Sequence, residues 1–252
     1  MSLIIGDWLD DLLAATAFLT RIPMPRRDTR ASLARAYRAF PLVGVGIGAT
    51  IGGLYLLMLR IGLPTIAAAA LALGAGAMLT GALHEDGFAD LADGFGGGRD
   101  KAAKLDVMRD SRLGTYGALA LLTSFVAKIG ALSILPRSEV LVAMIVTHAL
   151  ARAPLAVLAA SMPYARADGL AASAGRPDSL IALTACVVAA LIALVALPAT
   201  TAMIAAFVTA VAAASLAALA QQQIGGQTGD VLGAAEQVCE VAVLLTLAAR
   251  VV

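Results

Sequence analysis

The chain has 252 residues, of which 60% are hydrophobic and only 14% are charged, and its formal net charge is +1. This composition cannot supply the polar surface of a soluble domain, and the near-neutral charge gives no reason to expect a nucleic-acid partner. It therefore excludes an ordinary soluble protein and favours a protein embedded in lipid.

The first predicted element, residues 7–20, is apolar on one face and acidic on the other, with Trp8 near its start. It is short for a bilayer span, and amphipathic helices of this kind lie in the headgroup region. We therefore expect residues 1–39 to form an interfacial and cytoplasmic N-terminal segment.

Seven apolar stretches approach or exceed the ~20 residues that cross the hydrocarbon core of a bilayer. In the first of them, Gly44, Gly48 and Gly52 have the spacing of closely packed membrane helices. Cys186 and Cys239 lie inside two others and are expected to be buried thiols, not a disulfide. The predicted fold class is all-α, a polytopic integral membrane helical bundle with about seven transmembrane helices plus the N-terminal interfacial helix, forming one membrane-embedded catalytic domain over residues 1–252. The stretches cover residues 40–59, 63–83, 113–135, 140–162, 180–197, 201–220 and 231–252.

Basic residues are divided unequally between the connections that alternate along these spans. Because cytoplasmic loops are rich in Lys and Arg, the richer side is expected to be cytoplasmic. The polar, motif-like loops fall on the same side, so we expect a multi-pass protein of the cell inner membrane whose active face is cytoplasmic. The richer side holds Arg21, Arg26, Arg27, Arg30, Arg35, Arg38, Arg99, Lys101, Lys104, Arg109, Arg112, Arg166 and Arg176, and the other side only Arg60, Arg137 and Arg250.

The cytoplasmic segment 84–117 is expected to be catalytic, and it opens with the acidic stretch His84-Glu85-Asp86-Gly87-Phe88-Ala89-Asp90-Leu91-Ala92-Asp93-Gly94. Asp86, Asp90 and Asp93 recur at i, i+4 and i+7 and would share one helix face, with Glu85 to the side. Like charges arranged in this way repel each other, and an all-oxygen cluster suits Mg²⁺ or Mn²⁺ better than zinc. The alternative is a solvated acidic helix face, but the membrane context favours a metal site.

A second polar cluster follows the flexible Gly96-Gly97-Gly98. Asp106 and Asp110 are again four residues apart and would share a helix face, while Arg109 and Arg112 share a neighbouring one. Carboxylates that hold a metal beside guanidiniums that grip phosphate oxygens are the groups that phosphoryl transfer needs. For both arginines the alternative is a salt bridge to a nearby aspartate, or the ordinary positive flank of a cytoplasmic loop.

Ionisable residues also occur inside the predicted spans, where they need partners. His148 and Arg152 are four residues apart in one span, and Glu236 and Glu240 in another. We expect these helices to meet and to pair Arg152 with a glutamate, a structural role.

The loop at residues 225–230, Gly-Gly-Gln-Thr-Gly-Asp, precedes the last predicted span. Thr228 and Asp230 would open that helix as an N-cap beside an anion-binding helix terminus, the alternative being a plain turn.

The acidic stretch, the segment 108–117 and the segment 225–234 together resemble the cobalamin synthase family, the adenosylcobinamide-GDP ribazoletransferases. Arg21-Ile22-Pro23-Met24-Pro25 and Phe40-Pro41-Leu42-Val43-Gly44 add to the resemblance, which spans nearly the whole chain. It implies a membrane transferase that joins adenosylcobinamide-GDP to α-ribazole or its 5′-phosphate, giving adenosylcobalamin or its phosphate and GMP in the last steps of cobalamin biosynthesis, with Mg²⁺ required. One departure is Asp106, where we expect the family to carry Glu.

Residues and resemblance together predict the site. Five aspartates would hold one or two Mg²⁺ ions, and these ions would clamp the diphosphate. The remaining groups would bind phosphate or accept the proton of the attacking hydroxyl. Membrane lipid is an expected partner, and a homo-oligomer is compatible with the sequence. The metal ligands are Asp86, Asp90, Asp93, Asp106 and Asp110; the catalytic residues are Glu85, Asp86, Arg109 and Arg112; the substrate-binding residues are His84, Lys104, Ser111, Thr228 and Asp230.

Two other functions are considered. Asp90-x-x-Asp93-Gly94 followed by Asp106-x-x-x-Asp110 is loosely similar to the metal-binding signature of the CDP-alcohol phosphotransferases of lipid synthesis, but the connection is shorter and lacks their Ala-Arg. A multi-span transporter is the other alternative, although it would tend to show broken helices and midplane polar groups in two matching halves.

Overall fold

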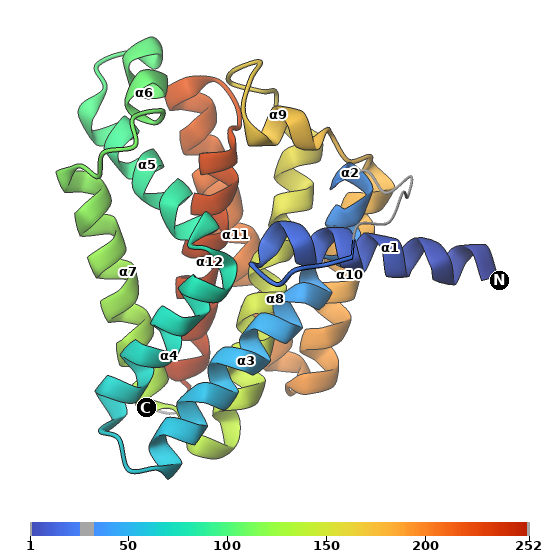
Figure 1. The fold of residues 1–252 in the computed structure, drawn as a ribbon, viewed down its shortest axis with the longest axis vertical. Helices are drawn as coiled ribbons and strands as arrows, with labels where there is room; N and C mark the ends of the chain where they lie inside the picture. Colours follow the sequence, from blue (N-terminus) through green and yellow to red (C-terminus); the bar gives the residue numbers. More distant parts are fainter. Residues whose placement is uncertain (1, 26–32, 251–252) are drawn as a thin grey trace.

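A computed structural model describes residues 2–25 and 33–250, and it confirms the all-α helical bundle. The long helices α7, α8, α10, α11 and α12 run roughly along one axis, whereas α1 lies across the bundle (Figure 1). The elements are α1 (Ser2–Leu19), α2 (Leu33–Ala36), the 3₁₀ helix η1 (Tyr37–Ala39), α3 (Phe40–Arg60), α4 (Thr65–Thr80), α5 (Leu83–Gly97), α6 (Lys101–Val107), α7 (Thr115–Ile134), α8 (Arg137–Ser161), α9 (Leu170–Ala174), α10 (Ser179–Ala196), α11 (Ala199–Ile224) and α12 (Gly229–Ala248).

Six helical stretches in the described residues are long and apolar enough to cross a membrane. They contain α3, α7, α8, α10, α11 and α12, and they match six of the seven predicted spans. Of these, α8 and α12 are mostly buried, whereas α10 and α11 expose most of their residues and would face lipid.

The remaining predicted span, 63–83, contains α4, which is too short to be counted as a span by itself. The chain forms the shorter α4, then turns by 94° into α5, so that the pair makes at most one broken span. Gly81 and Ala82 form the corner in the left-handed region, with φ values of 68° and 54°. The predicted span ends at this corner, because the apolar stretch gives way there to the polar residues of α5.

The connections separate into two ends of the bundle (Figure 1). α6, α9 and the α11–α12 connection lie at one end, and the α3–α4, α7–α8 and α10–α11 connections lie at the other. The motif-bearing loops therefore gather on one side, as the charge distribution predicted.

α1 is fixed to the bundle by charge. Asp11 is fully buried and accepts hydrogen bonds from Nε of Arg35 at 2.7 Å and of Arg38 at 2.6 Å. The Arg38 guanidinium also lies 4.2 Å from the ring centre of Trp8. Residues 26–32 of the predicted N-terminal segment lie outside the described residues.

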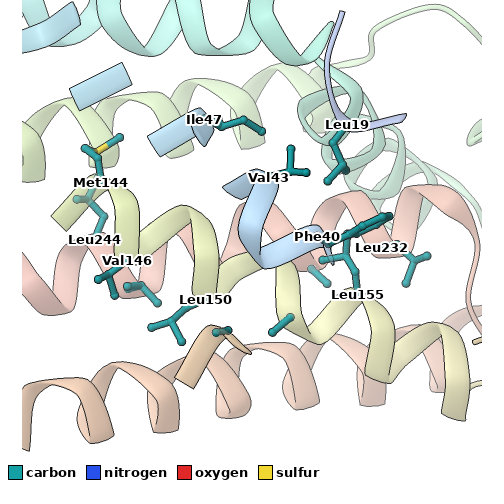
Figure 2. Packing of buried hydrophobic residues seen from close by; sticks show 14 of the residues in the cluster. Leu19, Phe40, Val43, Ile47, Met144, Val146, Leu150, Leu155, Leu232 and Leu244 are labelled. Atoms are coloured by element: carbon teal, nitrogen blue, oxygen red, sulfur yellow. The ribbon is translucent and has the colours of Figure 1, made fainter. Parts of the chain in front are cut away.

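α3 and α8 pack closely through small residues. A Cβ at Gly44 or Gly48 would overlap the backbone carbonyl of His148 or Met144 on α8. The predicted small-residue packing is thereby confirmed, and Val43 and Ile47 of α3 lie in the same core as Met144 and Leu150 of α8 (Figure 2).

Candidate active site

α5 and α12 cross closely, and this crossing assembles the polar site. A Cβ at Gly87 of α5 would lie 3.0 Å from Cα of Asp230, and one at Gly233 of α12 would lie 3.2 Å from Cα of His84. Asp86 and Asp90, on one face of α5, therefore meet Asp230 at the start of α12, and the three charges interact. We call Asp86, Asp90 and Asp230 the acidic face.

Arg166 is the cation that contacts the acidic face. Its Nη2 donates to Oδ2 of Asp230 at 3.3 Å, and its side chain is 15% exposed. Nη1 of Arg166 is buried and donates no hydrogen bond within the described part of the chain. Part of the guanidinium is therefore free to bind a ligand.

A backbone bridge holds Arg166 in place. Gln227 N donates to Pro163 O at 2.8 Å, and Ala165 N donates to Gln227 O at 2.9 Å. Gly226 is needed here, because a Cβ at this position would overlap the Pro163 carbonyl. The glycine-containing loop before α12 thus fixes both Asp230 and Arg166.

The acidic face has more negative than positive charge. Of the three carboxylates, Asp230 pairs with Arg166 and Asp90 interacts with it electrostatically. Asp86 and Asp230 line a cavity of about 100 Å³ together with Arg166 and His84. Oxygen-only donors with excess negative charge fit a hard divalent cation such as Mg²⁺. Within the described residues, His148, Glu236 and Glu240 are the only group of possible metal ligands with ligand atoms within 4.8 Å of one another, so the acidic face matches a metal site in its donor chemistry and not in closed ligand geometry. The buried Nη1 of Arg166 beside it can bind a phosphate oxygen.

Asp93 makes a different interaction from the one its spacing suggested. It is 8% exposed, and its two oxygens accept from Gly114 N at 2.7 Å and Gly117 N at 2.9 Å, at the start of α7. A Cβ at Gly114 or Gly117 would overlap this carboxylate. Asp93 therefore ties α5 to α7 as a helix-capping acceptor.

His84 and Glu85 extend the site into the interior. Nδ1 of His84 lies 3.2 Å from Oε2 of Glu236, while Glu85 lines a second, buried cavity with Lys128 and Glu240. His84 lines both cavities, so it stands between the acidic face and an ion network inside the bundle.

We call this group, His84, Lys128, His148, Arg152, Glu236 and Glu240, the buried network. Arg152 Nη1 lies 2.7 Å from Glu236 and 3.3 Å from Glu240, which confirms the predicted pairing. Glu240 also contacts His148 Nδ1 at 2.5 Å and Lys128 Nζ at 3.3 Å. His148, Glu236 and Glu240 could ligate a metal by distance alone, but Arg152 and Lys128 already balance both glutamates.

The expected single helix through Asp106 and Asp110 is wrong, because α6 ends at Val107. The Asp110 side chain accepts from Arg112 N at 3.1 Å, a local turn that competes with helix formation. Hydrogen bonds from the Arg112 side chain lower the pKa of Asp110 to about 2. Asp110 lies beyond the end of α6, so it does not share a helix face with the exposed Asp106.

The two predicted phosphate-binding arginines are paired at the surface. Arg109 Nη2 donates to both oxygens of Asp168 at 2.7 and 2.9 Å, and Arg112, whose side chain is 87% exposed, pairs with Asp110. Neither arginine belongs to the cavity lining found in the described residues.

The other predicted substrate-binding residues are spread around this end. Thr228 forms the expected N-cap of α12, since its Oγ1 accepts from Val231 N at 3.2 Å, and it also donates to Asp230 Oδ2 at 3.2 Å. Lys104 donates to Gln223 on α11, and Ser111 is exposed.

Sequence reasoning missed Arg166 as the partner of the acidic face and treated Asp230 only as a substrate contact. The glycines at 225, 226 and 229 could have indicated a contact here, because glycines before a helix often allow another backbone segment to approach closely.

Comparison with known proteins gives a consistent result. A family model described as Cobalamin-5-phosphate synthase matches residues 11–248. Proteins named adenosylcobinamide-GDP ribazoletransferase are similar over nearly their whole length: one from Sinorhizobium medicae is 41% identical (97% of this chain and 98% of the relative), and one from Bradyrhizobium diazoefficiens is 43% identical (97% and 95%). No solved structure matches the chain.

Proposed function

The chain belongs to the Cobalamin-5-phosphate synthase family and is a transferase of cobalamin synthesis, and from this premise we propose that it joins adenosylcobinamide-GDP to α-ribazole or its 5′-phosphate. The products would be adenosylcobalamin or its phosphate, and GMP. We further propose that residues 1–252 act as one membrane-embedded catalytic domain.

The observation that carries this proposal is the excess negative charge of the acidic face beside Arg166, at a cavity between helices. A diphosphate substrate needs its charge balanced, and carboxylates alone would repel it. Mg²⁺ bound by Asp86, Asp90 and Asp230 would neutralise diphosphate oxygens and hold them for displacement.

The chain's own groups then have separate roles. The unpartnered Nη1 of Arg166 would donate to a phosphate oxygen. A ribose hydroxyl of α-ribazole would attack the phosphorus next to cobinamide, and the bond from that phosphorus to the GMP oxygen would break. Asp86, which lines the cavity, would accept the hydroxyl proton in preference to Glu85, which lines the inner cavity.

The remaining predicted residues stay part of the proposal. Arg109 and Arg112 would exchange their exposed carboxylate partners for the diphosphate, and this exchange costs little because exposed ion pairs are weak. Lys104, Ser111 and Thr228 would complete the substrate contacts. Asp93, Asp106 and Asp110 stay proposed metal ligands, with Asp93 also holding α7.

We propose that the end of the bundle with α6 and α9 faces the cytoplasm of a cell with this protein in its inner membrane. A single cysteine replacing the exposed Gly97, where a Cβ meets nothing within 4 Å, should then react only with a membrane-permeant thiol reagent in intact cells, in a background without Cys186 and Cys239. Reaction with an impermeant reagent would contradict this orientation.

The decisive experiment uses purified protein in lipid with adenosylcobinamide-GDP and α-ribazole, measuring GMP release and corrinoid product together. We expect turnover that stops in EDTA and returns with Mg²⁺ but not Zn²⁺. Full turnover in EDTA would contradict the metal assignment. Turnover of a CDP-activated alcohol in place of these substrates would favour the CDP-alcohol phosphotransferase alternative.

A further inference from the structure

The side chains that line the cavity beside the acidic face form two chemically different groups, which we call its polar end and its apolar end. One end carries His84, Asp86, Arg166 and Asp230. The other end is apolar and is formed by α1, η1, α3, α5, α8, α9 and α12 through Phe18, Tyr37, Phe40, Leu83, Leu155, Ala171, Ala174 and Leu232.

Aromatic rings form a continuous part of the apolar end. The Phe40 ring centre lies 4.5 Å from that of Tyr37 and 5.9 Å from that of Phe18, with interplanar angles of 28° and 19°. Figure 2 shows Phe40 close to Leu155 and Leu232, which line the same cavity. Rings and aliphatic chains together suit a flat, apolar ring system.

We infer that this apolar end, lined by Phe18, Tyr37 and Phe40, binds the base of the ribazole nucleoside and not the guanine of the other substrate. The inference rests on the proposed function and assigns one part of that site. Guanine carries an amino group, a ring N–H and a carbonyl, and burying these against apolar side chains would leave them unpaired. The dimethylbenzimidazole of α-ribazole has few polar atoms, and its methyl groups gain from burial.

The polar end of the cavity supports the same orientation of the nucleoside. A nucleoside whose base lies against Phe40 would place its ribose towards Asp86 and Asp230, which line the same cavity. The attacking hydroxyl would then lie beside the carboxylates that the reaction needs. One ligand thus satisfies both ends of the cavity.

The first test uses the wild-type, full-length enzyme in lipid nanodiscs with α-ribazole analogues that lack one or both base methyl groups. We expect the KM of the nucleoside to rise about fourfold for each methyl removed, the effect of losing ~0.8 kcal/mol per buried carbon. The KM of adenosylcobinamide-GDP should stay constant. Equal nucleoside KM values across the series would overturn the inference.

The second test fills the apolar end. Ala174→Leu adds bulk from α9 and should raise the KM of α-ribazole at least ~10-fold, because added methylenes overpack a closed site. Inhibition by GMP should be unchanged, since the guanine site lies elsewhere. Ala172→Leu is the matched control, because this residue lies on the same helix outside the cavity lining.

The outcomes separate the two proposals. Weaker GMP inhibition in Ala174→Leu, with an unchanged KM for α-ribazole, would place guanine at the apolar end and overturn the inference. Unchanged values for both ligands would also overturn it. Absence of any product with wild-type enzyme would instead contradict the proposed function. If Ala174→Leu fails to fold, the analogue series still decides.

Discussion

α5 and α12 carry two groups of ionisable side chains that differ in how their charges are balanced. In the buried network, Glu240 contacts Lys128, His148 and Arg152, and Glu236 contacts His84 and Arg152. In the acidic face, Arg166 pairs with Asp230 alone among the three carboxylates, and Asp86 and Asp230 border a cavity.

The difference separates a structural role from a ligand-binding role. Buried charges that are paired inside the protein hold helices together and need nothing from outside. Carboxylates that are crowded without enough cations favour an external one. Carboxylates on the same helix, Asp230 in the acidic face and Glu236 and Glu240 in the buried network, would therefore have different roles.

The largest expected effect is at the acidic face. Asp90→Asn removes charge with little change in volume, and it should lower kcat/KM by at least ~1,000-fold, since metal stabilisation of the transition state is worth several kcal/mol. The unfolding temperature in metal-free buffer should be unchanged or higher, because a repulsion is removed.

Asp100→Asn is the matched control for this variant. Asp100 is an exposed N-cap of α6, and Asn is an equally good cap. Steady-state kinetics and thermal unfolding in detergent measure both variants. A strongly destabilised Asp90→Asn protein would show that the acidic face is structural, and it would contradict the distinction between the acidic face and the buried network.

In the buried network, removing a carboxylate should lower stability and leave activity largely unchanged. Glu240→Gln leaves Lys128 and Arg152 without their shared carboxylate, so the free energy of unfolding should fall by ~3 kcal/mol. The folded fraction should keep most of its activity. Equilibrium unfolding in mixed detergent measures the change.

Adding Lys128→Met to Glu240→Gln should recover part of this stability, because it removes the cation left unpaired. A stable but inactive Glu240→Gln protein would give the network a role in the reaction and contradict the distinction.

A smaller effect is expected for the arginines. Arg166→Lys keeps the charge but loses the planar fork, and it should lower kcat/KM by ~30-fold, while Arg109→Lys and Arg112→Lys should each lower it by ~10-fold. Arg60 lies at the other end of the bundle, where α3 ends, so Arg60→Lys should leave kcat/KM nearly unchanged. Normal rates for Arg109→Lys and Arg112→Lys would return these residues to the role of surface ion pairs.

Features that depend on local pattern were predictable from the sequence. Hydropathy located six spans, and the four-residue spacing placed Asp86 and Asp90 on one face of α5, because both follow from helix periodicity. The same spacing located the glutamates of α12 that pair with Arg152.

Features that depend on which helices meet were not predictable in the same way. Asp93 leaves the acidic face because Gly114 and Gly117 allow the start of α7 to approach it. Arg166 reaches Asp230 only through the bridge at Gln227. These contacts depend on close backbone approach between distant segments, which a periodic pattern does not encode.

The corner between α4 and α5 has a consequence for the electrostatics of the site. Because the chain turns by 94° at Gly81 and Ala82, a new helix begins there, with Glu85 and Asp86 in its first turn. Aligned peptide dipoles give a helix N-terminus roughly half a positive elementary charge, which favours carboxylates within the first turn. A straight helix through residues 65–97 would have cancelled that partial charge in its interior. The bend therefore supplies positive potential to Glu85 and Asp86 without using a basic side chain.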